Sequence, residues 1–222
     1  MLHLGSIRGT TIDVDFSFLI LIGLFVALNY SPERGVHHAL LWIPIAFLSV
    51  LVHELAHAAM IAIFGYGSSQ IILGGMGGVT INARRAKPWQ DMLISLAGPF
   101  SSFGLAFLSL WIYRNVAFAQ TDRMLDAFLP LFYWANSRWG MFNLIPVPPL
   151  DGGHAVRSFF SIFLRDRTAF MISTWIALLG GGGIAVWAFI GGSFFIAFYI
   201  AWFVFMAFQR WQDFQKYGTP QD

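Results

Sequence analysis

A long uncharged stretch near the C-terminus constrains the fold of this chain most strongly. Residues 168–209 contain no Asp, Glu, Lys or Arg. Across the whole chain only 11% of residues are charged and 57% are hydrophobic, and the mean hydropathy is +0.66. A soluble domain typically has about a quarter of its residues charged. Because so few charges cannot cover a surface that faces water, the sequence predicts an integral membrane protein.

The chain of 222 residues has room for about six membrane spans of ~20 residues with short connections, and none for a second soluble domain. The N-terminus lacks the basic region and the small-residue cleavage site of a signal peptide, so we expect the first apolar segment to stay as an anchor. We therefore predict an all-α integral membrane protein with about six transmembrane helices, forming a single domain over residues 1–222. The predicted spans are 16–30, 38–64, 89–113, 127–145 and two within 168–209, which separate near Gly191 and Gly192.

Residues 65–83 interrupt this helical pattern. Glycine recurs there, which disfavours a helix, and the β-branched residues Ile71, Ile72, Val79 and Ile81 favour strands. This composition predicts a small membrane-associated β hairpin, because non-helical backbone at membrane depth persists only where it is buried in protein or lines a wet cavity. Residues 2–15 alternate loosely between apolar and polar and predict a short strand or an extended lead-in.

The positive charges on the loops predict an orientation. With six spans, both termini lie on the same side as the second and fourth loops, and cytoplasmic loops carry an excess of Lys and Arg. Arg34, Arg114 and Arg123 fall on the opposite side, while Arg138 falls inside a span, where its role stays open. The sequence therefore predicts a multi-pass protein of the cell membrane with both termini in the cytoplasm. The cations on the side of the termini are Arg8, Arg84, Arg85, Lys87, Arg157, Arg165, Arg167, Arg210 and Lys216.

The motif HELAH at residues 53–57 carries the clearest chemical signal. Side chains four residues apart lie on one face of a helix, so the imidazoles of His53 and His57 can reach one metal ion. Glu54 is then placed to take a proton from a metal-bound water. The pattern also arises by chance on soluble amphipathic helices, but within a membrane span every ionisable side chain is costly and is a functional candidate.

A zinc ion bound by two histidines needs a third protein ligand. The chain has no cysteine, which excludes thiolate ligands and disulfides. The candidates are Asp151 and His154, which follow a proline-rich break after the fourth predicted span. Such a backbone can bend a carboxylate toward the bundle, but Asp-Gly is also common in ordinary turns. The residues alone leave both interpretations open.

Four motifs together resemble the site-2 protease family of intramembrane zinc metalloproteases. HELAH in a predicted transmembrane helix is followed by FNLIPVPPLDGG, which is similar to the family's Asn-Pro…Asp-Gly pattern. SLAGP at residues 95–99 is similar to a motif of the family's third core helix, and the glycine-rich segment 74–79 is similar to its membrane-associated hairpin. The resemblance covers most of residues 1–155, with the core motifs in 38–155, whereas residues 156–222 match only in hydrophobic character. The second motif's matching positions are Asn143, Pro146, Asp151 and Gly152.

This resemblance implies a site and an activity. One Zn²⁺ per chain would be held by His53, His57 and Asp151, with Glu54 as the general base. Asn143 would contact the substrate backbone or help to stabilise the oxyanion, although a structural hydrogen bond is an alternative, and His154 would support the site or belong to the loop. The expected activity is hydrolysis of peptide bonds in or near transmembrane segments, as in regulated intramembrane proteolysis.

The expected partners are the lipid bilayer and a membrane protein substrate with a transmembrane helix. Such a substrate must unwind locally before its carbonyls can be attacked, and residues 71–82 could hold the unwound strand by adding it to a sheet edge. The chain has no room for a PDZ or CBS domain. Its net charge of +2 is too small to indicate nucleic acid, and the sequence does not indicate an oligomeric state.

Other functions compete with proteolysis. A metal transporter or channel also places histidines and carboxylates within spans, but it does not need Glu54 beside a ligand. An inactive homologue could serve as a membrane scaffold, but every proposed catalytic position is filled. A haem or quinone site could be suggested by the 18% aromatic content, which lipid-facing and interfacial positions explain well enough.

Overall fold

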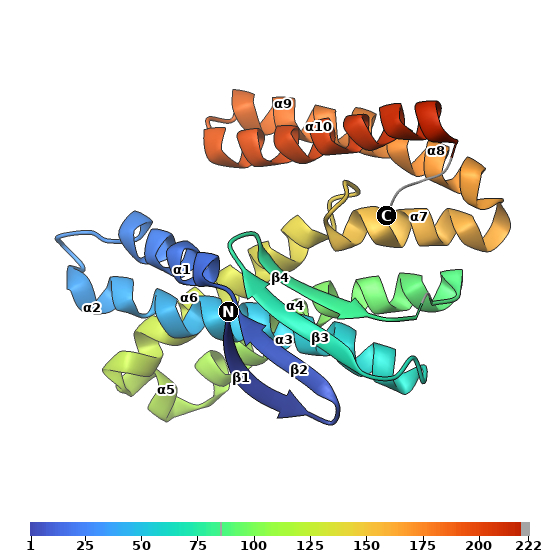
Figure 1. Cartoon of the computed structure of the whole chain (residues 1–222). Coiled ribbons are helices and arrows are strands. Elements are labelled where there is room, and N and C mark those ends of the chain that lie inside the picture. The colour runs from blue at the N-terminus through green and yellow to red at the C-terminus, as the bar shows by residue number, and fades with distance from the viewer. Residues whose placement is uncertain (85, 219–222) are drawn as a thin grey trace. The chain divides into compact units, whose positions relative to one another are not determined.

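The computed structural model describes residues 1–84 and 86–218. Arg85, one of the cations used to predict the orientation, lies outside them. Figure 1 traces the chain from two strands at the N-terminus to a long C-terminal helix. The elements are β1 (Leu2–Ile7), β2 (Thr10–Val14), α1 (Phe16–Leu28), α2 (Gly35–Leu40), α3 (Trp42–Ile63), β3 (Ser69–Gly74), β4 (Gly77–Asn82), α4 (Pro88–Asn115), α5 (Ala117–Thr121), α6 (Arg123–Asn143), α7 (Asp151–Phe163), α8 (Asp166–Ile176), the π-helical segment η1 (Ala177–Gly181), α9 (Gly182–Ile190) and α10 (Phe194–Tyr217).

Helices occupy every predicted span, and the expected mainly helical fold with a small sheet is confirmed. Within the described residues, four helical segments are long and apolar enough to cross a membrane. Of the other predicted spans, α1 is apolar but only 13 residues long, and α6 carries several polar and charged side chains along its length. The four long apolar segments are Gly35–Ile63, Pro88–Asn115, Asp166–Ile190 and Phe194–Tyr217.

The chain divides into two compact units. Unit 1 comprises Met1–Arg85 and Ala97–Met141, and unit 2 comprises Ala86–Leu96 and Phe142–Asp222. Helices α4 and α6 therefore each contribute residues to both units. The single domain expected over residues 1–222 stays a prediction.

The sheet in unit 1 is larger than the sequence predicts. Its strand order is β1-β2-β3-β4, with antiparallel pairing in β1–β2 and β3–β4 and parallel pairing between β2 and β3. The hairpin expected within residues 65–83 is β3–β4, and the lead-in expected at 2–15 is a second hairpin that extends the same sheet. The pairing of β2 with β3 was not predicted, because strands so far apart in sequence leave no local pattern.

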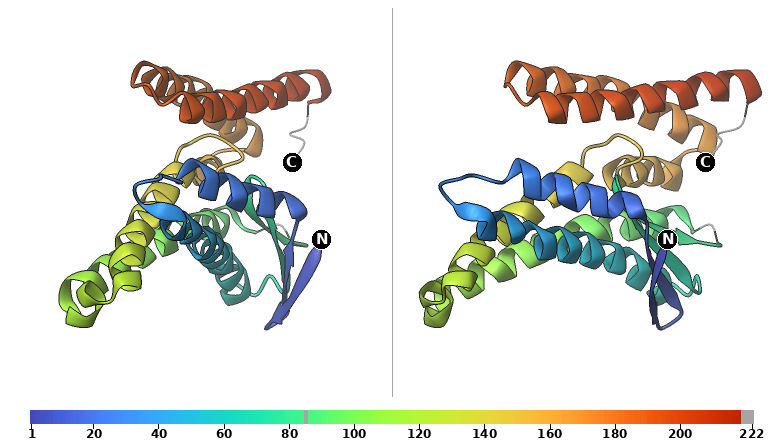
Figure 2. Two further views of the ribbon diagram at one scale, coloured as in Figure 1. Left: turned by 90° about the vertical axis from the view of Figure 1, so that its left-hand side faces the viewer. Right: turned by 60° about the vertical axis from the view of Figure 1, so that its left-hand side comes forward.

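An apolar core joins this sheet to two helices of unit 1. Alternate residues of β2 and β3 point toward α1 and α3, as the period of two in a strand dictates. Figure 2 shows α1 running beside α3. The core fixes the position of α3, which carries the HELAH motif. Its buried members are Ile12, Val14, Phe18, Ile22, Ala46, Val50, Ala58, Ile71 and Leu73.

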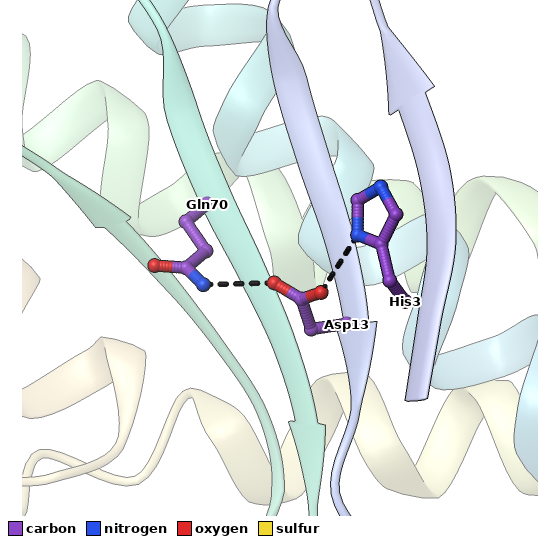
Figure 3. Close-up of polar contacts among 3 residues, drawn as sticks. All are labelled: His3, Asp13 and Gln70. Carbon is purple, nitrogen blue, oxygen red and sulfur yellow. Dashed lines mark hydrogen bonds and ion pairs between the residues drawn. The ribbon is translucent and has the colours of Figure 1, made fainter. Parts of the chain in front are cut away.

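Polar contacts across the sheet bind its first three strands together (Figure 3). The Asp13 carboxylate accepts a hydrogen bond from Gln70 Nε2 at 2.8 Å and lies 2.9 Å from His3 Nδ1. The bond from Gln70 and then that from His3 hold the pKa of Asp13 below its usual value. These contacts link β1, β2 and β3 from one carboxylate.

A polar turn ties the β3–β4 hairpin to the start of α1. Asp15 caps α1 by accepting a hydrogen bond from the Ser17 N–H at 3.0 Å. The Ser17 hydroxyl donates to Asp15 and accepts from the Gly75 N–H at 2.8 Å. A methyl group at Gly75 would lie 3.0 Å from Ser17 Cβ. The turn that leads into β4 is thus anchored where α1 begins.

Unit 2 contains a loop that folds back on the helix it precedes. Asp151 is the first residue of α7 rather than part of an isolated turn, and the helix continues to Phe163. Methyl groups at Gly152 and Gly153 would lie 2.3 Å from Leu144 O and 2.4 Å from Pro148 N. The two glycines are therefore needed where the first turn of α7 lies against its own loop.

Val147 anchors this loop in the apolar core of unit 2. Its side chain is fully buried, and a methyl group at Gly181, at the end of η1, would lie 2.4 Å from Val147 Cγ2. Figures 1 and 2 show α9 and α10 side by side. The C-terminal helices thus contact the loop before Asp151. The buried residues of this core are Val147, Leu150, Ala177, Phe203 and Ala207.

Candidate metal centre

Helix α3 places three polar side chains of the HELAH motif in the interior of unit 1. The exposed fractions are 2% for His53, 4% for Glu54 and 6% for His57. The two imidazole centroids lie 4.9 Å apart with the ring planes at 77°, and each ring offers a nitrogen within 4.8 Å of the other. Two imidazoles one helical turn apart therefore face a common point, as their spacing predicts.

Gly98 of α4 makes room for both imidazoles. A methyl group on its Cα would lie 2.3 Å from Nε2 of His57 and 2.5 Å from Nε2 of His53. The two Nε2 atoms are thus directed at the same small space beside the α4 backbone. Helix α4 continues through Gly98 and Pro99. The close approach of α4 to the imidazoles explains why a residue without a side chain stands here.

Two neighbours contact the His53 ring from other elements. Ser102, which is fully buried on α4, places its Oγ 3.0 Å from His53 Nδ1. The Trp139 ring of α6 lies at 74° to the imidazole plane, with 6.2 Å between centroids. Gly77 in turn leaves space for that indole, since a methyl there would lie 2.9 Å from Trp139 ring atoms. The His53 ring is held on two sides.

Strand β4 holds the Glu54 carboxylate. Thr80 Oγ1 lies 2.7 Å from Glu54 Oε2, to which it donates, and 3.1 Å from the Glu54 carbonyl oxygen. Gly78, two residues earlier and therefore on the same face of the strand, would place a methyl 2.4 Å from Glu54 Cγ. On the opposite face, Val79 and Ile81 are exposed. One face of β4 thus contacts Glu54, whereas the side chains on the other face are exposed.

The remaining predicted site residues belong to unit 2. Asn143 is the buried last residue of α6, Asp151 is the partly buried first residue of α7, and His154 is exposed on α7. Unit 1 thus brings His53, Glu54 and His57 together. The roles of Asp151 and Asn143 stay predictions.

Arg138 lies outside this cluster. It is exposed, and its guanidinium carbon lies 5.1 Å from the centroid of the Trp134 ring, one helical turn earlier on α6. This geometry is typical of a cation–π contact. Asp126, near the start of the same helix, accepts a hydrogen bond from the Tyr113 hydroxyl at 3.0 Å.

Sequence reasoning missed the neighbours that hold the motif. Ser102 and Thr80 are common residue types in positions that no periodic pattern singles out. Thr80 has one weak signal, because it alternates with the apolar residues Val79 and Ile81 in a predicted strand. Ser102 has another, since it stands one helical turn after Gly98.

Comparison with known proteins identifies the group to which this arrangement belongs. The model of the family described as Peptidase family M50 matches residues 42–180. That range contains the HELAH motif, the Gly98 turn and Asp151. The chain belongs to peptidase family M50.

Relatives of this M50 family member are named as zinc metalloproteases. Rip3 of Mycobacterium tuberculosis, which carries that name, is 29% identical over 224 residues, covering 92% of this chain and 56% of Rip3. A zinc metalloprotease of Methanocaldococcus jannaschii is 28% identical over 188 residues, covering 83% of this chain and 52% of that protein. The chain thus spans about half the length of these two relatives.

A solved structure has the same fold. The site-2 protease from Methanocaldococcus jannaschii superposes with a TM-score of 0.64 at 24% sequence identity, covering 94% of each chain. Together with the four long apolar segments, membership of the M50 family makes this chain a membrane protein.

Proposed function

We propose that this chain is an intramembrane zinc metalloprotease that hydrolyses peptide bonds in or near the transmembrane segments of other membrane proteins. The observation that carries the proposal is the burial of Glu54 beside two imidazoles whose Nε2 atoms face one space. In a membrane protein such a buried carboxylate is costly and marks a functional site. The names of the two relatives support the same activity.

The residues present fit a zinc ion. Two imidazole nitrogens directed at one point are typical zinc ligands, and a carboxylate oxygen is the usual third ligand in hydrolytic sites. We propose Asp151 for that place, because it stands at the Asp position of the Asn-Pro…Asp-Gly pattern that the sequence resembles. One ion per chain is expected, with the fourth position left for water or substrate.

In the proposed reaction Glu54 moves the proton. Bound zinc would supply Lewis-acid chemistry, lowering the pKa of a water to ~7 and polarising the scissile carbonyl. Glu54 accepts the proton as the water oxygen bonds to the carbonyl carbon, and it passes that proton to the nitrogen as the C–N bond breaks. The hydrogen bond from Thr80 to Oε2 fixes the carboxylate during both transfers. Asn143 is proposed to contact the substrate backbone or the developing oxyanion.

Strand β4 is proposed to hold the unwound substrate. It is the last strand in the sheet order, so an extended peptide can pair with its outer edge by strand addition. The exposed side chains of Val79 and Ile81 would then contact substrate side chains. We expect Ile81→Asp to weaken cleavage of a transmembrane substrate while zinc content, measured by metal analysis, stays at the wild-type level. Equal loss of zinc and cleavage would contradict this role.

The orientation in the membrane is also a proposal. The excess of Lys and Arg around the termini and the second and fourth loops supports a multi-pass protein of the cell membrane with both termini in the cytoplasm.

The deciding experiment compares the wild-type chain with Glu54→Gln in proteoliposomes that contain a model transmembrane substrate. Glutamine keeps the size of the side chain but cannot accept the proton, so we expect zinc content to be unchanged and cleavage to fall by about 10²- to 10⁴-fold. A metal transporter would instead keep its zinc flux in the variant. Cleavage at the wild-type rate by Glu54→Gln would refute the proposed function.

A further inference from the structure

The Ser102 hydroxyl lies between two groups in the interior of unit 1. On one side is the carbonyl oxygen of Gly98, one helical turn earlier on α4, at 3.3 Å from Oγ. On the other side is Nδ1 of His53 on α3, at 3.0 Å. Ser102 has no exposed surface and His53 is 2% exposed. Bulk water therefore does not compete with the Ser102 hydroxyl for a hydrogen bond to His53.

The proton of this hydroxyl has a natural acceptor within its own helix. Serine within a helix commonly donates to the carbonyl four residues earlier, and for Ser102 that carbonyl belongs to Gly98. A hydroxyl that donates there has its lone pairs left for a neighbouring N–H. Nδ1 of His53 lies within hydrogen-bond distance at 3.0 Å and can then carry the ring proton.

The position of that proton decides whether His53 can bind a metal. A neutral imidazole has one protonated nitrogen and one with a free lone pair, and only the latter can be a ligand. With the proton on Nδ1, the lone pair lies on Nε2, which faces the same space as Nε2 of His57 beside Gly98. With the proton on Nε2, the nitrogen that faces this space could not coordinate.

We infer that Ser102 is a positioning residue for the metal centre. It accepts a hydrogen bond from His53 Nδ1–H, selects the tautomer with a free Nε2 and fixes the rotation of the ring. The inference rests on the proposed metal site and extends it, because it assigns part of the metal affinity to a side chain that touches neither the metal nor the substrate. Partners of this kind typically account for about 10- to 100-fold in metal affinity.

The chain provides a matched control on the same turn of α4. Ser101 also donates to the Gly98 carbonyl, at 2.7 Å, and it is partly buried. Ser101→Ala therefore removes the same hydroxyl group and a bond to the same carbonyl, but it leaves the contact with His53 intact.

The test measures zinc affinity by competition with a chelator, using the full zinc-loaded chain in detergent or nanodiscs. We expect Ser102→Ala to bind zinc about 10- to 100-fold more weakly and Ser101→Ala to bind it like the wild type. Ser102→Thr, which keeps the β-hydroxyl, should restore most of the affinity. The zinc-free forms of the two alanine variants should unfold at similar temperatures.

Three results would overturn the inference. The first is a Ser102→Ala variant with wild-type zinc affinity. The second is an equal loss of affinity in both alanine variants. The third is a loss of affinity in Ser102→Ala that accompanies a lower unfolding temperature of the zinc-free protein, because Ser102 would then serve the fold alone. Cleavage is not the readout, so a chain whose zinc affinity depends on Ser102 but which cleaves no peptide would refute the proposed function and leave the inference standing.

Discussion

At the scale of single residues, two glycines set the distance between backbone and reactive side chains. Gly98 lets α4 approach the imidazoles of His53 and His57, and Gly78 lets β4 approach Glu54. Neither glycine has a positive φ among the backbone angles of the chain. Close packing rather than an unusual backbone conformation therefore accounts for both.

Substitutions at these two glycines should affect metal binding and proton transfer separately. Gly98→Ala would place a methyl 2.3 Å from His57 Nε2, so we expect zinc affinity to fall by about 100-fold or more, although alanine is the better helix former by about 1 kcal/mol. Gly78→Ala would place a methyl 2.4 Å from Glu54 Cγ, so we expect cleavage to fall while zinc content is kept. Metal analysis and a cleavage assay on both variants check the prediction.

Matched controls exist on the same two elements or their neighbours. A methyl at Gly104 of α4 would meet no atom within 4 Å, and one at Gly74 of β3 would lie 3.8 Å from Ser17 Oγ. Alanine at either position should leave both zinc content and cleavage near the wild-type level. A loss of zinc in Gly78→Ala as large as in Gly98→Ala would contradict the separation.

The candidate residues on α3 could be predicted from sequence because their chemistry and spacing are local. His53, Glu54 and His57 stand within five consecutive positions, and a helix alone brings them together. Ser102 and Thr80 could not be predicted, because their roles arise from contacts across 49 and 26 positions of the chain. Nothing in a single sequence specifies which small polar residue will lie opposite a histidine.

At the scale of elements, the carboxylate of Asp13 in β2 links the sheet through hydrogen bonds to residues of β1 and β3. The pKa of Asp13 is lowered by its bonds to Gln70 and His3. A group with a lower pKa in the folded state stabilises that state above its unfolded pKa and loses the contribution as the pH falls through the folded value. The contribution of Asp13 is therefore complete at neutral pH and is lost in acid below its ordinary value of 3.8.

This linkage predicts an acid-sensitive sheet edge. When the pH is lowered from 5 to 3, amide hydrogen exchange in β1 and β2, corrected for the intrinsic effect of pH, should accelerate in the wild type. Asp13→Asn cannot titrate, so its exchange should respond less to the same change. An identical response in both proteins would show that another group controls the edge.

Helices were predictable where hydropathy is sustained, and strands only where glycine and β-branched residues cluster. The hairpin of β3 and β4 has both signals within a few residues. The hairpin of β1 and β2 shows only a weak alternation of apolar and polar residues. Its second strand, β2, pairs in parallel with β3, which places Thr11 opposite Gln70. That pairing is stabilised by a shared core with α1 and α3, which no local window of sequence contains.

At the scale of the whole molecule, the absence of cysteine offers a clean test of the proposed orientation. Ser6→Cys in β1 and Thr121→Cys at the end of α5 each create a single thiol on an exposed position. In sealed membrane vesicles, a membrane-impermeant maleimide should label Ser6→Cys only from the cytoplasmic side and Thr121→Cys only from the opposite side. Labelling of both variants from one side would contradict the orientation.

Because Val147 packs against Gly181, the C-terminal helices have a structural role besides their contact with lipid. Any pair of sufficiently hydrophobic helices could insert into the bilayer, but only a pair with glycine at position 181 leaves space for the isopropyl group of Val147. Exchanging residues 166–217 for generic leucine-rich spans would therefore preserve insertion and still release the loop that ends at Asp151. The C-terminal helices therefore contribute a surface whose shape is complementary to the loop, and a hydropathy profile does not detect this property.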